Sequence, residues 1–173
     1  MTIEKCTLAD VDLILELYQA ARTLQHQKQM VVWPLFERSF LQKEVEEGRQ
    51  WKLVQNKTMV CNWAITFADK EIWEQKDLSD AIYIHRIATH PAYRGQRYID
   101  AIVAWAKPYA GSLGKRFIRL DTLGNNTALI RHYTSAGFVF LGMVKLTDTD
   151  NLPQHYQSEP NCCLFEIDLL GKS

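Results

Sequence analysis

Apolar residues recur at three- and four-residue spacing in four stretches of the chain, which is the pattern of a helix with one buried face. The first stretch follows Thr7, whose hydroxyl can cap a helix, and its pattern loosens from Arg22. The others are centred on residues 36–45, 99–106 and 126–133. We expect Gly48 to end the second helix, and Pro108 to kink or end the third because proline removes one helical hydrogen bond.

Short stretches rich in β-branched and aromatic residues predict seven strands. They are expected over residues 2–6, 51–55, 59–67, 82–89, 116–121, 138–146 and 164–169. Asn56-Lys57 separates the second strand from the third, as the turn of a hairpin does. Residues 68–80 and 147–161 are polar and are predicted to be loops, with Ile72 and Trp73 folded back on the body of the protein.

The order of these elements, β-α-α-β-β-β-α-β-α-β-β, mixes hairpins with strand-helix-strand crossovers. We therefore expect an α/β (α+β) fold with a mixed, largely antiparallel central sheet flanked by helices. A chain of 173 residues is long enough for one well-buried core and short for two. This length predicts a single domain over residues 1–173.

The stretch from Ile82 to Val103 joins a strand, a turn and a helix. His90-Pro91 ends the strand, because proline has no N–H for the ladder, and Arg94-Gly95 precedes the helix. A strand that leads through a short turn into a helix leaves backbone N–H groups pointing outward, with the positive end of the helix dipole behind them. This arrangement predicts an anion site, most naturally for phosphate.

The formal charge of the chain is zero, with 20 basic and 20 acidic residues interspersed. The chain therefore has no general field that would attract nucleic acid or an anionic membrane. No apolar run approaches the length of a membrane span, and the N-terminus lacks a basic segment followed by an apolar run. We expect a cytoplasmic protein with no nucleic-acid or membrane partner.

The four cysteines, Cys6, Cys61, Cys162 and Cys163, show no C-x-x-C spacing. In a cytosolic chain we interpret them as reduced, small apolar residues. The adjacent Cys162 and Cys163 could form a redox pair, but we favour a strand in the protein interior.

Two side chains are candidates for acid and base chemistry. His85 has an ordinary pKa of about 6.5, so it can exchange a proton near neutrality. Alternation along the strand places it on the same face as Tyr83 and Thr89, and places Arg86 on the opposite face, where we expect an ion pair. Tyr133 lies on the apolar face of its helix, and its phenol is a neutral proton donor. His85 could equally be a core residue, and the alternative for Tyr133 is that its ring only packs in the core.

Two segments of the chain resemble the signature segments of the GCN5-related N-acetyltransferases. Thr89-His90-Pro91 and Arg94-Gly95-Gln96 agree with the strand end and helix start of that family. In the later segment, Asn126 is followed seven positions on by a tyrosine, Tyr133, and then by Gly137-Phe138. Together with the order of the elements, this resemblance covers nearly the whole chain.

The resemblance implies an acetyl-coenzyme A site. The backbone amides of the turn would bind the pyrophosphate, and the strand backbone would pair with the amides of the pantetheine arm. Asn126 would help to hold the same arm. The turn residues are Arg94, Gly95, Gln96, Arg97, Tyr98 and Ile99, and the strand residues are Ile87, Ala88 and Thr89.

The turn departs from the family pattern at two positions, because Arg97 and Ile99 stand where the family usually has glycine and glycine or alanine. Glycine there lets a phosphate approach the backbone without an intervening side chain. Arg97 and Ile99 must therefore point away or reshape the turn. Either Arg97 adds a charged contact to a phosphate, or the cofactor site is weakened or lost.

The resemblance also implies catalytic and acceptor residues. Tyr133 matches the tyrosine that is commonly assigned as the general acid, and His85 matches a histidine of some amine-acetylating members. Asp69, Glu71 or a chain of waters are alternative bases. Trp33 lies where the family builds its acceptor wall, and Tyr83 stands where some members carry a further histidine, which makes both candidate acceptor contacts.

We therefore expect an acetyl-CoA-dependent N-acetyltransferase that transfers an acetyl group directly to a primary amine of a small molecule or a protein. Such a transfer requires no metal. The other interpretation is a non-catalytic module of the same fold that binds a ligand or a partner and has an altered cofactor turn. Exposed edge strands are compatible with a monomer or a homodimer.

Overall fold

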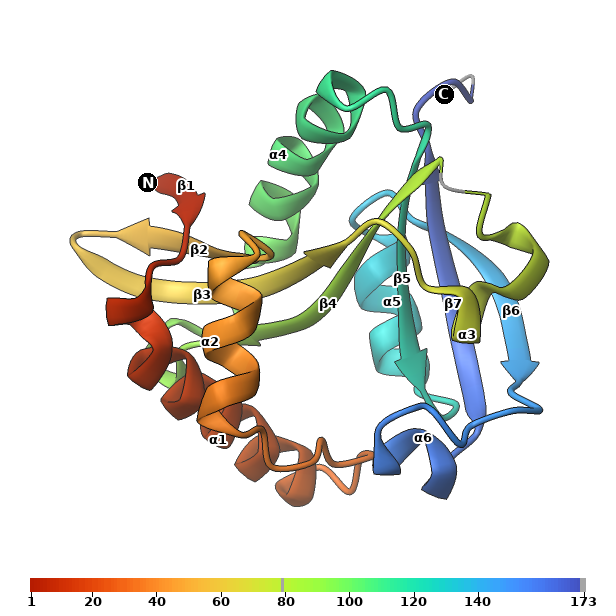
Figure 1. Cartoon of the computed structure of the whole chain (residues 1–173), viewed down its shortest axis with the longest axis horizontal. Coiled ribbons are helices and arrows are strands. Elements are labelled where there is room, and N and C mark those ends of the chain that lie inside the picture. Colours follow the sequence, from red (N-terminus) through yellow and green to blue (C-terminus); the bar gives the residue numbers. More distant parts are fainter. Residues whose placement is uncertain (79, 172–173) are drawn as a thin grey trace. The chain divides into compact units, whose positions relative to one another are not determined.

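A computed structural model describes residues 1–78 and 80–171 of the chain. Its seven strands form a sheet in the order β1-β2-β3-β4-β5-β7-β6 (Figure 1). Pairing is antiparallel for β1 with β2, β2 with β3, β5 with β7 and β6 with β7, and it is parallel for β4 with β5. The predicted mixed, largely antiparallel sheet flanked by helices is confirmed.

The chain divides into two compact units. The first unit comprises Met1–Ile65 and Ile84–Arg97, and the second comprises Thr66–Tyr83 and Tyr98–Ser173. Strand β4 (Ala81–Thr89) begins in the second unit and continues into the first.

The first unit packs two helices against strands. Its elements are β1 (Thr2–Lys5), a 3₁₀ turn (Leu8–Asp10), α1 (Val11–Gln27), α2 (Arg38–Glu46), β2 (Gln50–Gln55), β3 (Thr58–Thr66), the later part of β4, and a second 3₁₀ turn (Pro91–Tyr93). Val11, Ile14 and Leu17 of α1 form a core with Leu41 of α2, and Ala88 of β4 belongs to the same cluster. This core fixes the end of β4 relative to both helices.

The hairpin between β2 and β3 is confirmed. Asn56 and Lys57 both have positive φ, +51° and +64°, as a two-residue type I′ turn requires. Asparagine tolerates this region well and lysine less so.

The second unit contains α3 (Lys70–Trp73), a 3₁₀ turn (Glu74–Lys76), α4 (Tyr98–Ser112), β5 (Phe117–Leu123), α5 (Thr127–Thr134), β6 (Val139–Lys145), α6 (Gln154–Ser158) and β7 (Asn161–Asp168). Ile72 and Trp73 are buried, as the sequence predicted, in a core that Tyr83 and Leu164 share. The predicted loops over residues 68–80 and 147–161 each contain a short helix, α3 and α6 respectively.

Two helices are longer than the sequence predicted. Helix α4 continues through Pro108 to Ser112, although a kink or an end was expected. Ala104, whose carbonyl loses its helical partner, and Pro108 are both exposed, so water can satisfy that carbonyl. Helix α1 runs to Gln27 rather than loosening from Arg22. No helix within residues 1–78 and 80–171 has the length and apolar character needed to cross a membrane.

Candidate functional site

Arg86 interrupts β4 with a left-handed backbone conformation. Its φ is +50°, a region that costs a non-glycine residue about 1–2 kcal/mol. Such a residue inside a strand is typical of a β-bulge, which bends and twists the strand locally. Arg86 and Ala88 nevertheless both pack with residues of α1 and α2, in agreement with the predicted alternation from Tyr83 to Thr89.

The side chain of Arg86 is held within the first unit. Its Nη2 donates to both carboxylate oxygens of Glu44 at 2.6 Å, and its Nε donates to the Tyr18 hydroxyl at 3.2 Å. The guanidinium also lies over the rings of Phe36 and Phe40, 5.4 and 5.3 Å from their centroids. The predicted ion pair of Arg86 is confirmed, and its partner is Glu44 of α2.

His85 precedes Arg86 on β4 and is partly buried. Burial, followed by the positive charges of Arg86 and Arg49, lowers the pKa of His85 to about 3. The imidazole is therefore neutral at physiological pH, and its protonated form is a strong acid. This finding differs from the ordinary pKa of about 6.5 on which the assignment of His85 as a base depends.

The three strand residues after Arg86 are anchored by their side chains. Ala88 is buried in the core of the first unit, and the Thr89 hydroxyl donates to Cys61 Sγ at 3.6 Å. Ile87 is partly buried. The side chains thus fix this stretch of β4, while a partner that pairs with it as a strand would use only its backbone.

The turn after β4 has an exposed backbone with two left-handed residues. His90 Nδ1 accepts from the Ala92 N–H at 3.2 Å, and Arg94 Nη2 donates to the Ala20 carbonyl of α1 at 3.0 Å. Gly95 has φ +82° and Arg97 has φ +51°. Apart from Gly95 itself and its two chain neighbours, no heavy atom of the described residues lies within 4 Å of the place where a Cβ on Gly95 would sit. The turn therefore leaves open space on its Gly95 side, which fits a phosphate group.

Arg97 keeps a backbone conformation that glycine adopts without strain, so Arg97→Gly is expected to stabilise the protein by about 0.5–1 kcal/mol. The gain is partial because glycine also increases the entropy of the unfolded chain and removes the interactions of the Arg97 side chain. Urea unfolding of both proteins measures it. As a control, Gly95→Ala should destabilise the protein, because alanine at φ +82° is strained. A loss of stability in Arg97→Gly would contradict this account of the turn.

Tyr98 and Ile99 begin α4 in the second unit, and both side chains are buried. Ile99 is 3% exposed, so its side chain packs in the interior instead of covering the helix N-terminus. The sequence left open whether Ile99 points away or reshapes the turn, and in the structure it points away.

Trp33 lies in the irregular segment between α1 and α2. Its backbone N–H donates to Gln25 Oε1 at 2.9 Å, and its backbone carbonyl accepts from Arg22 Nε at 2.8 Å. Its ring contacts Tyr18 and Phe36 edge to face, with centroids 5.6 and 6.4 Å apart. The C-terminal turns of α1 thus hold this segment in place, which explains why α1 is longer than predicted. The segment forms a partly exposed aromatic surface.

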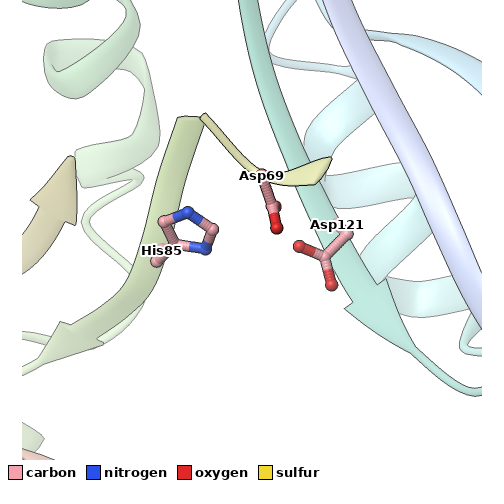
Figure 2. Close-up of side chains that lie close together, drawn as sticks. All are labelled: Asp69, His85 and Asp121. Carbon is pink, nitrogen blue, oxygen red and sulfur yellow. The ribbon is translucent and has the colours of Figure 1, made fainter. Parts of the chain in front are cut away.

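In the second unit, Asp69 and Asp121 bring two carboxylates together (Figure 2). Their closest-facing oxygen atoms lie within 4.8 Å of each other. Asp69 precedes α3 and is 9% exposed, while Asp121 is a residue of β5. Asp121 Oδ2 accepts from the Tyr156 hydroxyl of α6 at 3.1 Å, and the backbone N–H of Asp69 donates to Asp77 at 2.9 Å.

Burial and mutual repulsion make this carboxylate pair hold protons unusually tightly. Burial, and after it the charges of Asp121, Glu71 and Asp77, raises the pKa of Asp69 to about 8. Burial also raises the pKa of Asp121 to about 6, against the opposing effect of the Tyr156 hydrogen bond. Near neutral pH the pair therefore carries about one proton and about one negative charge.

Tyr83, a predicted acceptor contact, is fully buried in the second unit at 0% exposure. Its hydroxyl donates to Asp77 Oδ1 at 2.8 Å and accepts from Arg119 Nη1 at 3.1 Å. Trp73 packs beside its ring, with centroids 5.8 Å apart. This placement does not favour the predicted contact with an acceptor and makes Tyr83 part of the support around Asp77.

Asn126 precedes α5, and Tyr133 lies on it. Asn126 is the N-cap, and its Oδ1 accepts from the Leu129 N–H at 3.0 Å. Tyr133 is partly exposed, and its ring contacts Phe138 and Phe165, with centroids 6.0 and 5.3 Å apart. The ring is therefore fixed by packing, which is a requirement for a positioned proton donor.

The four cysteines are free and buried. Burial raises the pKa of Cys6 and of Cys61 to about 12, and it also raises the pKa of Cys162 and Cys163. Cys162 and Cys163 lie on β7, so the interior-strand interpretation is confirmed. The thiolate is the reactive form of cysteine, and these sites disfavour it.

We expect the native protein at pH 7.5 to resist a thiol reagent such as dithionitrobenzoate, because its thiols are buried and protonated. Less than one equivalent should react within about ten minutes of mixing, since access requires opening of the structure. All four thiols should react in denaturant. Rapid reaction of two thiols in the native protein would instead revive the redox interpretation of Cys162 and Cys163.

Sequence reasoning missed Glu44, Asp121, Tyr156 and Asp77 as parts of these clusters. Asp121 ends a stretch predicted as a strand, and its acidic side chain was the one available signal. Glu44 lies on a helix rich in charged residues, and no pattern distinguishes it from its exposed neighbours.

Comparison with known proteins identifies a family match. Residues 32–138 match the model of the acetyltransferase (GNAT) family. An uncharacterized N-acetyltransferase of Bacillus subtilis (strain 168), YesJ, is 30% identical over 74 residues, which are 43% of this chain and 41% of that protein. The matched stretch thus spans less than half the length of this relative.

Solved structures share the fold at low sequence identity. A GNAT-family acetyltransferase of Listeria monocytogenes 4b F2365 superposes with a TM-score of 0.75 at 18% identity, covering 96% of this chain and 94% of the other. The Salmonella typhimurium protein yncA, a putative acetyltransferase solved with acetyl-CoA, superposes with a TM-score of 0.70 at 15% identity. That alignment covers 99% of this chain and 95% of yncA.

Proposed function

Because the chain belongs to the acetyltransferase (GNAT) family, we propose that it is an acetyl-CoA-dependent N-acetyltransferase that acts directly on a primary amine of a small molecule or a protein. The observation that carries this proposal is the exposed turn after β4, with its left-handed Gly95 and Arg97 and the open space beside Gly95. We treat residues 1–173 as one N-acetyltransferase domain and propose a cytoplasmic location.

The residues of the turn fit a pyrophosphate. Backbone N–H groups from Arg94 to Ile99 would bind it, and Arg97 has a left-handed conformation that glycine adopts without strain. The buried side chain of Ile99 leaves the helix start uncovered. The backbone of Ile87, Ala88 and Thr89 would pair with the pantetheine amides, and Asn126 would support that arm.

Acetyl-CoA, when bound, supplies an activated acetyl thioester. The protein must remove a proton from the acceptor ammonium and return one to the leaving thiolate. We assign the return of the proton to the phenol of Tyr133. For the removal, the Asp69 and Asp121 pair has pKa values of about 8 and 6, which suit a base near pH 7 better than the pKa of about 3 of His85. We therefore assign His85 a hydrogen-bonding role as a neutral imidazole.

The aromatic surface around Trp33 supports an acceptor with an apolar part. Trp33 and Phe36 are partly exposed, and Leu35 is 72% exposed. Aromatic and aliphatic side chains of this kind commonly line one wall of a ligand pocket. The best acceptors are then amines that carry an aliphatic or aromatic group.

The proposal is tested by incubating the protein with acetyl-CoA and a panel of amines, beginning with polyamines and arylalkylamines. Each transfer should release one equivalent of coenzyme A thiol and yield one equivalent of N-acetylated amine by mass spectrometry. Binding of acetyl-CoA without transfer to any primary amine, including protein N-termini, would favour the non-catalytic module. In that case, higher acetyl-CoA affinity in the double variant Arg97→Gly, Ile99→Gly would indicate a decayed turn.

A further inference from the structure

The ion pair of Arg86 and Glu44 connects both helices of the first unit with strands β2 and β4. Glu44 of α2 is 1% exposed and also accepts from Arg49 Nη1 at 3.1 Å and from Gln50 Nε2 at 2.8 Å. Arg86 donates in addition to Tyr18 of α1. One buried carboxylate therefore joins α2, β2 and β4, and its guanidinium partner adds α1.

The same guanidinium supports the aromatic segment. The rings of Phe36 and Phe40 stack on each other with centroids 5.8 Å apart, and both lie within 5.4 Å of the Arg86 guanidinium carbon. Phe36 in turn contacts Trp33. The Arg86 side chain thus contacts the aromatic segment that we assign to acceptor binding.

Nothing in the local sequence makes residue 86 left-handed, because arginine has no preference for positive φ. If Arg86 relaxed to an extended conformation, the local bend and twist of the strand would change, and the residues after it would shift. The core contacts of Ala88 and the contact of Thr89 with Cys61 would then be disturbed. The contacts of the Arg86 side chain with Glu44, Tyr18, Phe36 and Phe40 can offset the free energy that the left-handed state costs.

We propose that Arg86 and Glu44 are positioning residues: their buried ion pair fixes the left-handed step in β4, and with it the register of Ile87, Ala88 and Thr89 and the placement of the Trp33 to Phe40 aromatic segment. Buried ion pairs are often replaceable by apolar residues without loss of stability, so stability alone does not account for this pair. The inference rests on the proposed function only for its effect on acetyl-CoA affinity.

The first measurement does not depend on that function. Hydrogen exchange followed by mass spectrometry is compared for the wild type and for Arg86→Lys, which keeps the charge but loses the planar, two-directional donation and the ring stacking. We expect at least tenfold faster exchange in peptides covering residues 84–90 and 30–40, with β5 and β7 unchanged. A uniform increase over the whole chain, or no change at residues 84–90, would overturn the proposal.

A second variant separates the effect of the left-handed backbone from the effect of the Arg86 side-chain contacts. Arg86→Gly adopts positive φ without strain and removes the anchor. If the side chain sets the register, this variant also exchanges faster at residues 84–90 and binds acetyl-CoA at least tenfold more weakly by calorimetry. Wild-type exchange and affinity in Arg86→Gly would show that a left-handed residue suffices and would overturn the role of the ion pair.

The matched control is Asp12→Asn, which removes the exposed ion pair of Asp12 with Arg38, another link between α1 and α2. It should change neither exchange at residues 84–90 nor acetyl-CoA affinity. Where either Arg86 variant fails to fold, Tyr18→Phe removes only one acceptor of Arg86 and is expected to give a two- to fivefold effect in the same peptides. If the wild type itself does not bind acetyl-CoA, the proposed function fails while the exchange result still decides this inference.

Discussion

Tyr133→Phe is expected to lower kcat for acetyl transfer by about 100-fold or more, the usual contribution of a positioned general acid. The variant loses only the hydroxyl, and its ring keeps the contacts with Phe138 and Phe165. Stability and the KM for acetyl-CoA should therefore change little. Steady-state kinetics at saturating amine measure the effect, with thermal unfolding as the check on folding.

The control for this variant is Tyr109→Phe, which removes the hydroxyl of a partly buried tyrosine on α4, where it stacks on Trp105. It should retain wild-type kcat. Equal activity of Tyr133→Phe and wild type would show that Tyr133 only packs, and the leaving thiolate would then receive its proton from another group.

The second large effect is a pH dependence of stability caused by Asp69 and Asp121. Because the pKa of Asp69 rises from 3.8 to about 8 on folding and that of Asp121 to about 6, the folded protein holds protons that the unfolded chain releases above pH 4. Stability should therefore fall as the pH rises from about 4 to 8, by a few kcal/mol in all, and then level off. Asp69→Asn should flatten this decline and unfold at higher temperature than wild type at pH 9. Thermal unfolding from pH 4.5 to 9 measures both proteins.

Asp168, also in the second unit, provides a control because its pKa is lowered on folding, whereas those of Asp69 and Asp121 are raised. Its hydrogen bonds with Arg116 lower its pKa to about 2, so it stabilises the protein above pH 4 and this contribution is lost as the pH falls toward 2. Asp168→Asn should therefore leave the decline between pH 5 and 8 intact. If Asp69→Asn also left it intact, the two carboxylates would not share protons as described.

The sequence predicted the fold well because its main signals are local. Hydrophobic spacing predicted the positions of the helices. His90-Pro91 marked the end of β4, and Gly137 lies just beyond the end of α5. The order of elements then limited the topology to a mixed sheet. Pro108 was misread because a single missing hydrogen bond on an exposed face costs α4 little.

The candidate site was only partly predictable, since its decisive features depend on tertiary contacts. The left-handed state of Arg86 depends on partners 42 and 68 positions away, Glu44 and Tyr18. The low pKa of His85 and the high pKa of Asp69 come from burial, which a short sequence window does not reveal. The turn was predicted because its residues are contiguous. The carboxylate pair was not, because Asp69 and Asp121 lie far apart in the sequence and meet only in the folded chain.

The central claim is that this chain binds acetyl-CoA through the turn after β4. Isothermal titration of the purified protein with acetyl-CoA tests it most directly. We predict saturable binding at one site per chain, with a dissociation constant between about 1 μM and 1 mM, the range typical of enzyme substrates. No detectable heat at any temperature, together with no protection of residues 90–99 from hydrogen exchange at 5 mM acetyl-CoA, roughly five times the upper limit of that range, would contradict it.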